Sequence, residues 1–434
     1  MNVLFHTKNG LAADLTRFLK KEGHSVMLYV ADKKSRRIFD GFINKTENWH
    51  EGLAWVGKDG LIIFDDRGDG AQQDALRKKG YRVVGGGVRA DTLELERKTA
   101  QDIFEKYGLK VSMLRDFKNA TTALEFAKRN RRPWVIKQSN GVTKTAHYIG
   151  KSEDGRDVIE VLKGYIANPE FSNEPTTLHE RLDGVEIGVG RYFNGVDWVG
   201  PIEFNIEHSR LFAGDTGPVT NEMGTLAWYG DDDGNPLYQK TLAKMKPYLV
   251  EIGFKGDMEL NCMVNEKGAY ILEATPRFGT PIIHLQIDLH RSPWGDFLAA
   301  LADGTPYNLK WCRGYGLVVL LALPPFPLSP ENGESVALGT EFSLANLGEH
   351  ELSHIHFEEV SRIGESGRFR IADRYGYALY VTGIGETVEE AQEKVYGIIS
   401  KIVLPNSFYR NDIGVSFMQN SRQKLVDWGY FKKL

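Results

Sequence analysis

The sequence predicts an α/β protein, α+β overall, that is divided into two or three domains. Its 434 residues exceed what a single hydrophobic core usually holds. Near the N-terminus, short apolar runs alternate with segments of helical spacing, a pattern typical of parallel β-α units. In the middle of the chain, apolar segments flank turn sequences such as Asn194-Gly195, which predicts antiparallel hairpins.

Strands are predicted from apolar runs, and helices are predicted from apolar residues at three- and four-residue spacing. The first strand, NVLFH, is interrupted by a Lys-Asn-Gly turn, and the strand GLIIF ends in Asp65-Asp66. A proline-rich stretch, LPPFPLSP, is a connection. The expected strands are 2–6, 25–30, 60–64, 81–84, 132–138, 146–149, 176–182, 188–193, 198–204, 257–264, 269–274, 315–321 and 377–381. The expected helices are 11–21, 74–79, 100–107, 157–164, 236–252 and 387–402.

Composition excludes several classes of protein. Hydrophobic residues make up 41% and charged residues 26%, so the chain is an ordinary globular protein. The net charge of −4 argues against a basic nucleic-acid platform. Cys262 and Cys312 form neither a CxxC pair nor a disulfide framework, which favours a reducing cytoplasm. We find no signal peptide and no membrane-spanning apolar run.

Two glutamates on one predicted hairpin form a candidate metal site. Glu259 and Glu273 lie on its two strands, and both side chains can point into one cleft. Two converging carboxylates repel each other unless a cation lies between them, and Mg²⁺ bound to nucleotide phosphates prefers such oxygen ligands. Arg277 follows shortly after and could bind a phosphate or carboxylate through two hydrogen bonds. The alternative is a solvated hairpin edge with incidental charges.

Three lysines are candidates for binding phosphate. Lys137 ends an apolar strand, where a buried cation needs an anionic partner. Lys144 lies in the polar loop that follows, and such a loop can cover phosphates. Lys98 opens a helix, where an exposed lysine is common. For the last two lysines, a solvated position is the alternative.

The segment TTLHERL at 176–182 predicts a strand that leaves one subdomain for another. The backbone of such a segment can pair with an adenine edge, and the carboxylate of Glu186 just beyond it can accept ribose hydroxyls. A plain strand end with surface charges is the alternative.

These pieces, in this order, resemble the ATP-grasp superfamily, and within it the phosphoribosylamine–glycine ligase family. Residues 214–224, GDTGPVTNEMG, look like the family's GDTGPNTGGMG loop, and residues 271–279, ILEATPRFG, are similar to VIEFNCRFG. Residues 381–414 contain VTGIGETVEEAQEKVYGIISKI and FYRNDIG, similar to the family's C-terminal VTALGxTxxEAQxxAY and FxRxDIG. The resemblance covers essentially the whole chain, though weakly over the first ninety residues.

The resemblance implies a role for each matching position. Metal ligands would be Glu259 and Glu273, with Asn261 as the alternative to Glu259. Arg277, Lys144 and Asp215 would be catalytic. ATP would be bound by Lys98, Lys137, Lys144, Glu180, Arg181, Leu182 and Glu186. Substrate would be bound by Asp215, Thr216, Gly217, Pro218, Met223, Gly224 and Arg277. The implied domains are an N-terminal α/β domain at 1–97, an ATP-grasp domain at 98–308 with a lid at about 108–183, and a C-terminal mixed α/β domain at 309–434.

The same resemblance implies an activity. In this family a carboxylate attacks the γ-phosphate of ATP, and an amine then displaces phosphate from the acyl phosphate to form an amide. The implied cofactors are ATP and Mg²⁺ or Mn²⁺, and the implied partners are a small carboxylate such as glycine and a small amine. We expect a monomer or homodimer without nucleic-acid or membrane partners.

Departures from the family concentrate where the amine acceptor is expected. The family's GxGGREHA loop is replaced by residues 6–13, HTKNGLAA, and its GPExPL stretch by residues 65–70, DDRGDG. The added acids would repel a phosphate, with Arg67 offsetting part of that effect. The loop around Lys144 keeps one glycine, Gly141, and Thr275 replaces an asparagine. Three readings stay open: a divergent purine-pathway ligase, a ligase that joins an amino acid such as glycine to another amine, and a nucleotide-binding protein without catalysis.

Overall fold

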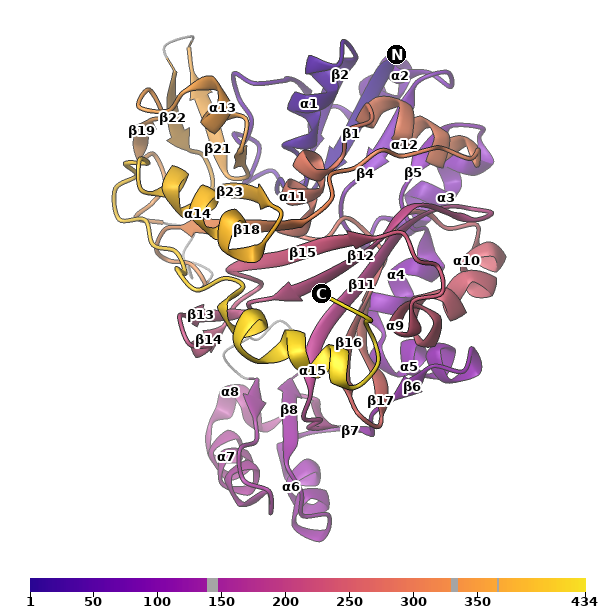
Figure 1. Cartoon of the computed structure of the whole chain (residues 1–434), viewed down its shortest axis with the longest axis vertical. Coiled ribbons are helices and arrows are strands. Elements are labelled where there is room, and N and C mark those ends of the chain that lie inside the picture. The colour runs from indigo at the N-terminus through magenta and orange to yellow at the C-terminus, as the bar shows by residue number, and fades with distance from the viewer. Residues whose placement is uncertain (139–146, 329–334, 365–366) are drawn as a thin grey trace.

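The computed structural model describes residues 1–138, 147–328, 335–364 and 367–434. Figure 1 shows a broad upper body crossed by a long sheet, with a narrow lobe projecting below it. Parallel and antiparallel sheets occur together, which confirms the predicted α/β class with α+β character.

The N-terminal unit is an open parallel sheet in the strand order β3-β2-β1-β4-β5. All four strand pairs are parallel, as the alternation of strands and helices predicted. The strand LIIF is buried along its whole length, as expected where helices cover both faces of a sheet. Its elements are β1 (Asn2–Thr7), α1 (Leu15–Lys21), β2 (Ser25–Val30), β3 (Asn44–Thr46), α2 (Trp49–Val56), β4 (Leu61–Phe64), α3 (Gly70–Lys78), β5 (Arg82–Val84), α4 (Val88–Leu95) and α5 (Arg97–Lys106).

The lower lobe in Figure 1 is a separate four-stranded antiparallel sheet in the order β7-β10-β8-β9. Two helices bury its apolar face in a cluster that includes Trp134, Leu162 and Leu178. The chain enters this lobe from β6 of the central sheet and returns to that sheet through β10 and β11, so the lobe projects from the main body as a lid. Its elements are β7 (Leu114–Phe117), α6 (Ala120–Arg129), β8 (Trp134–Gln138), β9 (Tyr148–Ile149), α7 (Arg156–Ala167), α8 (Pro169–Ser172) and β10 (Thr176–Glu180).

A nine-stranded sheet forms the middle of the molecule, in the order β20-β23-β18-β15-β12-β11-β16-β17-β6. Its hairpin of β16 and β17 turns at Asn265–Gly268, close to the predicted position. The elements from β6 to α12 are β6 (Lys110–Val111), β11 (Val185–Asn194), β12 (Trp198–Glu207), β13 (Arg210–Phe212), β14 (Thr216–Val219), β15 (Gly224–Gly230), α9 (Pro236–Lys240), a 3₁₀ helix (Leu242–Met245), α10 (Lys246–Ile252), β16 (Lys255–Asn265), β17 (Gly268–Thr275), α11 (Ile282–Leu289) and α12 (Trp294–Asp303).

The C-terminal segment completes this sheet and adds a small three-stranded sheet, β19-β22-β21. Strand β18 pairs with β15, so the domain boundary predicted at residue 308 separates strands of one sheet, and that boundary stays a prediction. The remaining elements are β18 (Tyr315–Ala322), β19 (Glu341–Ser343), α13 (Glu349–Leu352), β20 (Ile355–Phe357), β21 (Val360–Ile363), β22 (Arg368–Ile371), β23 (Tyr377–Gly385), α14 (Val388–Ile399), a π-helical turn (Phe417–Ser421) and α15 (Arg422–Asp427).

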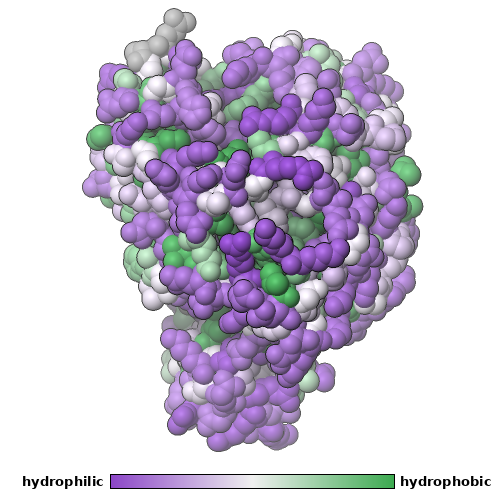
Figure 2. Space-filling model, in the orientation of Figure 1, coloured by the Kyte–Doolittle hydropathy of each residue, from purple (hydrophilic) through white to green (hydrophobic). Residues whose placement is uncertain are grey.

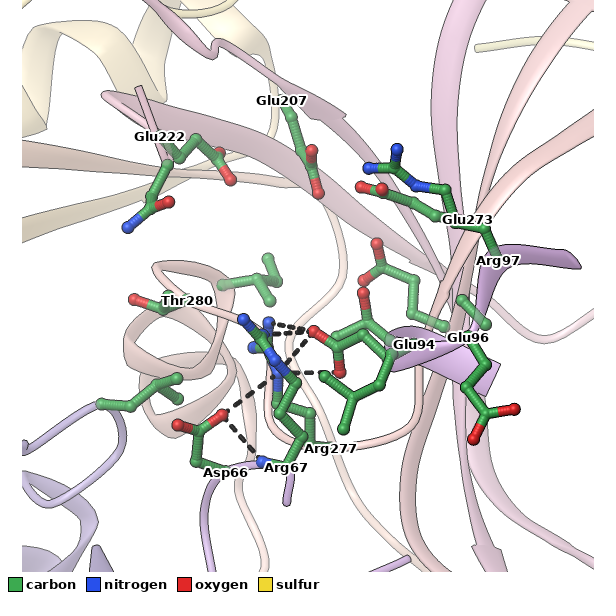
Figure 3. Close-up of a pocket in the computed structure, with 18 of the residues that line it drawn as sticks. Asp66, Arg67, Glu94, Glu96, Arg97, Glu207, Glu222, Glu273, Arg277 and Thr280 are labelled. Carbon is green, nitrogen blue, oxygen red and sulfur yellow. Dashed lines mark hydrogen bonds and ion pairs between the residues drawn. The ribbon is translucent and has the colours of Figure 1, made fainter. Parts of the chain in front are cut away.

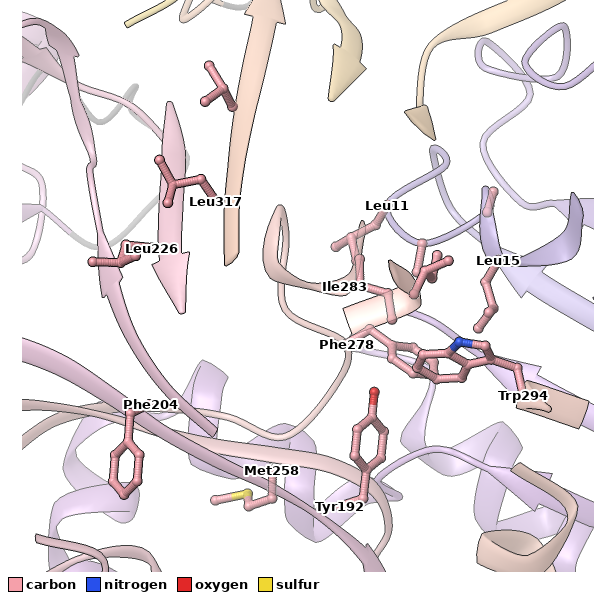
Figure 4. Packing of buried hydrophobic residues seen from close by; sticks show 14 of the residues in the cluster. Leu11, Leu15, Tyr192, Phe204, Leu226, Met258, Phe278, Ile283, Trp294 and Leu317 are labelled. Atoms are coloured by element: carbon pink, nitrogen blue, oxygen red, sulfur yellow. The ribbon is translucent and has the colours of Figure 1, made fainter. Parts of the chain in front are cut away.

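One apolar core joins the N-terminal unit, the central sheet and the C-terminal segment, whereas the lid has its own. Figure 4 shows Leu11 and Leu15 of the N-terminal unit facing Ile283 of α11 and Trp294 of α12, with Tyr192 of the central sheet below. The helices α11 and α12 therefore connect the N-terminal sheet to the central sheet. This packing fixes the N-terminal unit against the strands that carry the candidate site.

Several predicted elements differ in their bounds from the structure, and two of these differences have a clear local cause. The helix expected at 236–252 is broken into α9, a 3₁₀ helix and α10, because Thr241 is not helical and Pro247 begins a new helix. The strand expected at 176–182 ends at Glu180, before the chain crosses to β11. Among the described helices, none has the length and apolarity that a membrane span requires. The face in Figure 2 is mainly hydrophilic, with small scattered apolar patches.

Candidate active site

A cavity of about 840 Å³ lies where the lid, the central sheet, the N-terminal unit and the C-terminal strands meet. Figure 3 shows Glu207, Glu222 and Glu273 along its upper border and Asp66, Glu94 and Arg277 along its lower border. We call the first border the sheet end and the second the acceptor end. The cavity is also lined by Asn9, Leu11, Arg67, Glu96, Arg97, Lys98, Asp116, Gln138, His147, Thr177, Asn221, Glu259, Thr275, Thr280, Ile282, Glu358 and Tyr377.

At the sheet end, the β16–β17 ladder sets the carboxylates. Glu273 lies directly opposite Asn261, and Asn261 Nδ2 donates to Glu207 Oε2 at 3.1 Å. The Oδ1 atom of Asn261 is buried and has no hydrogen-bond partner among the described residues. An amide oxygen from β16 and carboxylates from β17 and β12 therefore lie close together, with β11 between β12 and β16 in the sheet.

Glu259 lies two residues before Asn261 on β16, opposite Thr275, and is buried. Asn205 Nδ2 donates to Glu259 Oε2 at 3.0 Å. Desolvation, followed by repulsion from Glu203 and Asp257, raises the pKa of Glu259 to about 8. A proton therefore stabilises Glu259 at neutral pH unless a cation takes its place.

The donor set at the sheet end fits Mg²⁺ or Mn²⁺. Both ions prefer carboxylate and amide oxygens, and Mg²⁺ is usually bound by one or two carboxylates together with substrate phosphates and water. Glu273, Glu207 and the unpartnered oxygen of Asn261 offer such atoms. The prediction of Asn261 as an alternative to Glu259 thus gains a physical reason, because Asn261 needs no proton removed before it can act as a ligand.

The predicted nucleotide lysines lie around the same end. Lys98 lines the cavity and forms an exposed ion pair with Asp102. Lys137 lies on β8 of the lid, opposite Thr177 of β10. Thr177, like Lys98, lines the cavity. Lys144 falls outside the described residues, so its predicted roles in catalysis and nucleotide binding stay predictions.

The carboxylate of Glu186 on β11 interacts electrostatically with charged groups of both the lid and the central sheet. Desolvation raises its pKa, repulsion from Glu273 adds to the rise, and the Lys137 cation opposes it. Asp215 also repels Glu186. The structure thus brings Lys137, Glu186, Glu273 and Asp215 within electrostatic range of one another.

The predicted hinge residues, Glu180 to Leu182, lie where the chain leaves the lid, and they do not line the cavity. Glu180 ends β10 and pairs with Arg132 Nη1 at 2.9 Å. The guanidinium of Arg181 donates to Gly150 O at 2.8 Å, within the lid. The side chains of Glu180 and Arg181 are therefore held on the lid, and adenine contact through this segment stays a prediction that rests on its backbone.

At the acceptor end, Arg277 is already engaged by protein carboxylates. Its Nη2 lies 2.9 Å from Glu94 Oε1, its Nε lies 3.7 Å from Asp66 Oδ1, and its Nη1 donates to Phe278 O (Figure 3). Arg67 Nη1 also contacts Glu94. Glu94 thus pairs with both arginines of this end, and Asp66 adds a second negative charge beside Arg277. The sequence had not indicated Glu94, which lies on α4 outside every motif.

Two buried carboxyl groups close to these arginines have raised pKa values. Burial raises the pKa of Glu358 to about 8 and that of Asp65 to about 7, with neighbouring acids adding to both shifts. The hydroxyl of Tyr380 donates to Glu358. The acceptor end therefore combines arginines that are paired with Glu94 and a carboxyl group, that of Glu358, that is mainly protonated at neutral pH.

The GDTGP stretch is anchored by the C-terminal motif FYRNDIG. Asp215 has a positive φ of 52°, and Arg410 Nη1 lies 2.8 Å from its Oδ1. Arg410 also pairs with Asp412 at 2.7 Å, and Asp412 accepts a hydrogen bond from Gly214 N at 2.8 Å. These contacts bring together two motifs that lie far apart in the sequence.

Several predicted substrate residues lie outside the cavity lining. The residues Asp215 to Pro218 are largely exposed around the hairpin of β13 and β14. Met223 is buried in an apolar cluster, and Gly224 begins β15. Asn221 and Glu222, between these two groups, line the cavity, and Asn221 Nδ2 donates to the hydroxyl of Tyr377. Both residues lie within the motif GDTGPVTNEMG, and this position was the sequence signal that could have identified them.

The two histidines considered as polar contacts are buried. His179 contacts Ser112, and His208 Nε2 accepts a hydrogen bond from Gly414 N at 3.2 Å. Burial lowers the pKa of both to about 4. Both histidines are thus neutral groups with local partners.

Comparisons with known proteins agree with this geometry. Residues 96–282 match the family model described as phosphoribosylglycinamide synthetase, ATP-grasp (A) domain. The chain is 25% identical to the phosphoribosylamine–glycine ligase of Clostridium acetobutylicum over 359 residues, 79% of this chain and 80% of that one. It is likewise 25% identical over 384 residues to that of Fusobacterium nucleatum, with 84% of each chain covered.

Solved structures show the same fold. The phosphoribosylamine–glycine ligase of Thermotoga maritima superimposes with a TM-score of 0.67 at 23% identity, over 95% of this chain and 100% of that one. Biotin carboxylase of Campylobacter jejuni gives a TM-score of 0.62 at 12% identity, over 96% and 95% of the two chains.

The lid, the central sheet and the oxygen-rich sheet end of the cavity define an ATP-grasp protein. Within that superfamily the chain is related to the phosphoribosylamine–glycine ligases, and it is an ATP-dependent carbon–nitrogen ligase.

Proposed function

We propose that this enzyme joins a small carboxylate, with glycine as the first candidate, to an amine that carries no phosphate group. The reaction proceeds through an acyl phosphate and releases ADP and phosphate. One observation carries the choice of acceptor: Glu94 already occupies both Arg67 and Arg277 at the acceptor end. A phosphate there would have to displace a carboxylate from two guanidinium groups.

The sheet end supports the phosphoryl step. Mg²⁺, when bound, would neutralise charge on the transferring phosphoryl group. Glu273 and Asn261 would hold that ion, with Glu207 fixing the orientation of the Asn261 amide. Asn261 then supplies the amide oxygen that the family places where Thr275 stands here. Lys137 and Lys98 add positive charge from the lid and from α5.

The remaining residues position the substrates. Arg410 and Asp412 hold the GDTGP stretch against the lid–sheet boundary. Closure of the lid over the nucleotide would exclude water, which protects the acyl phosphate from hydrolysis. In this proposal the protein supplies no nucleophile, because the attacking groups belong to the two substrates. The cytoplasm as the place of action stays a prediction from the sequence.

The test is a phosphate-release assay with ATP, glycine and a panel of amines. We expect turnover with one or more uncharged or cationic amines and little turnover with phosphoribosylamine. Rapid turnover of phosphoribosylamine and glycine would contradict the proposed acceptor while leaving the ligase class intact. Absence of turnover with every amine, together with measurable ATP binding, would favour the third reading of the sequence, a nucleotide-binding protein without catalysis.

A further inference from the structure

A buried cluster of histidine and aspartate side chains lies at the junction of three units. Asp14 comes from the turn before α1, His284 from α11 and His356 from β20. One ligand atom from each side chain lies within 4.8 Å of the other two, and all three residues are buried. None of them lines the cavity.

His284 is the unusual member of this cluster. It is fully buried, and neither of its ring nitrogens has a hydrogen-bond partner among the described residues. Burying an imidazole without hydrogen-bond partners destabilises the folded protein. Its ring stacks on Tyr380 at 4.3 Å between centroids, so packing holds the ring in place while its nitrogens stay unsatisfied. Such a group indicates a missing partner.

His356 is held on both sides. Its Nδ1 lies 2.9 Å from Asp14 Oδ2, and its Nε2 lies 3.3 Å from Asp288 Oδ2. Asp288 also contacts His354 and Thr382, which fix its orientation. A histidine that binds a metal through one nitrogen commonly donates its other N–H to a carboxylate in this manner.

We propose that Asp14, His284 and His356 bind a divalent transition-metal ion of the Zn²⁺ class, with Asp288 positioning His356 through its second nitrogen. Two imidazoles and one carboxylate favour Zn²⁺ or Co²⁺ over Mg²⁺, which prefers oxygen ligands. Arg17 pairs with Asp14 Oδ1 at 2.7 Å and leaves Oδ2 toward His356. Zinc binding replaces the proton that otherwise bridges His356 and Asp14, and a water can complete a tetrahedral site.

The ion would hold together segments that border the cavity. Helix α11 begins at Ile282, and the chain reaches Glu358 just after β20; both residues line the cavity. The metal therefore joins the N-terminal unit, α11 and the C-terminal strands behind the acceptor end. This role is structural and does not depend on which amine the enzyme uses.

The experiment uses the full chain, stripped with a chelator and dialysed. We expect it to regain about one Zn²⁺ or Co²⁺ per chain, measured by atomic spectroscopy, with a rise in Tm that Mg²⁺ alone does not give. His284→Phe keeps the stacking and removes both unsatisfied nitrogens. It should fold with an unchanged or higher Tm without metal and lose the ion and the metal-dependent rise.

Two further variants keep the proposal falsifiable. Asp288→Asn should weaken the metal affinity by about 10–100-fold, the range seen when a partner of a metal-binding histidine is removed. His290→Phe is the matched control: His290 is also buried but bonds Tyr229, and this variant should keep the ion. The proposal is overturned if the stripped chain binds no stoichiometric zinc, or if His284→Phe binds zinc as the unaltered chain does.

Discussion

The two ends of the cavity are built in different ways. The sheet end places Glu207, Asn261 and Glu273 on strands β12, β16 and β17 of one sheet, so ladder hydrogen bonds fix their spacing. The acceptor end takes Asp66, Glu94 and Glu358 from a loop, a helix and a strand connection, held by ion pairs and burial. In the proposed function, the phosphoryl chemistry and the choice of amine therefore depend on separate elements, so one can change while the other is kept.

The largest effect is expected from a variant that removes a proposed metal ligand at the sheet end. Glu273→Gln should lower kcat by about a hundredfold to a thousandfold, because the metal loses a ligand where charge develops. ATP turnover at saturating Mg²⁺ measures it. Glu266→Gln, on the exposed turn of the same hairpin, is the control and should keep full activity. Full activity of Glu273→Gln would show that the metal is held elsewhere.

The next effect concerns the anchor of the GDTGP stretch. Arg410→Lys should lower the free energy of unfolding by about 3 kcal/mol, because a lysine cannot pair with Asp215 and Asp412 together. Denaturant unfolding measures the loss. Arg313→Lys, an exposed arginine paired with Asp231, should cost less than about 1 kcal/mol. Equal losses in the two variants would contradict the anchoring role.

A third experiment exposes the arginines of the acceptor end. Glu94→Gln removes the carboxylate that pairs with Arg67 and Arg277, so inorganic phosphate should inhibit the variant about tenfold more strongly. Steady-state inhibition by phosphate measures the change. Glu96→Gln also lies on the cavity but forms no ion pair with either arginine, and it should resemble the unaltered enzyme. An unchanged inhibition constant in Glu94→Gln would remove the argument against a phosphorylated acceptor.

The smallest expected effect is on pH dependence. Burial raises the pKa of Glu358 from 4.5 to about 8, so the folded protein keeps a proton that the unfolded chain releases. Stability from this group is present below pH 4.5 and is lost as the pH rises through about 8.

Glu358→Gln, which resembles the protonated form, should therefore flatten the fall in unfolding free energy over that interval by at least about 1 kcal/mol. The slope will not vanish, because Glu259 shifts in the same direction. The exposed Glu393→Gln is the control, and denaturant unfolding across the pH range is the measurement. An identical slope in both variants would show that Glu358 is ionised in the folded protein.

The sequence predicted the residues of the sheet end better than those of the acceptor end, and the reason is physical. Alternation along strands predicted the β16–β17 hairpin and placed Glu259 and Glu273 on it, because strand geometry has a short, regular period. Glu94 and Glu358 were missed because their positions depend on tertiary packing of α4 and the C-terminal strands. The cluster of Asp14, His284 and His356 joins residues from three units, and no local pattern links them.

The continuity of the nine-stranded sheet has a consequence for synthesis. Strand β15 receives its partner β18 only after residues 315–322 have been made, well after the rest of the nucleotide-binding module. Until then β15 presents an unpaired edge, and such edges pair readily with other chains. At about 5–20 residues per second, the nascent chain spends several seconds in that state. We therefore expect a chain that stops near residue 308 to aggregate. The C-terminal segment would then be needed for folding without aggregation as well as for the cavity.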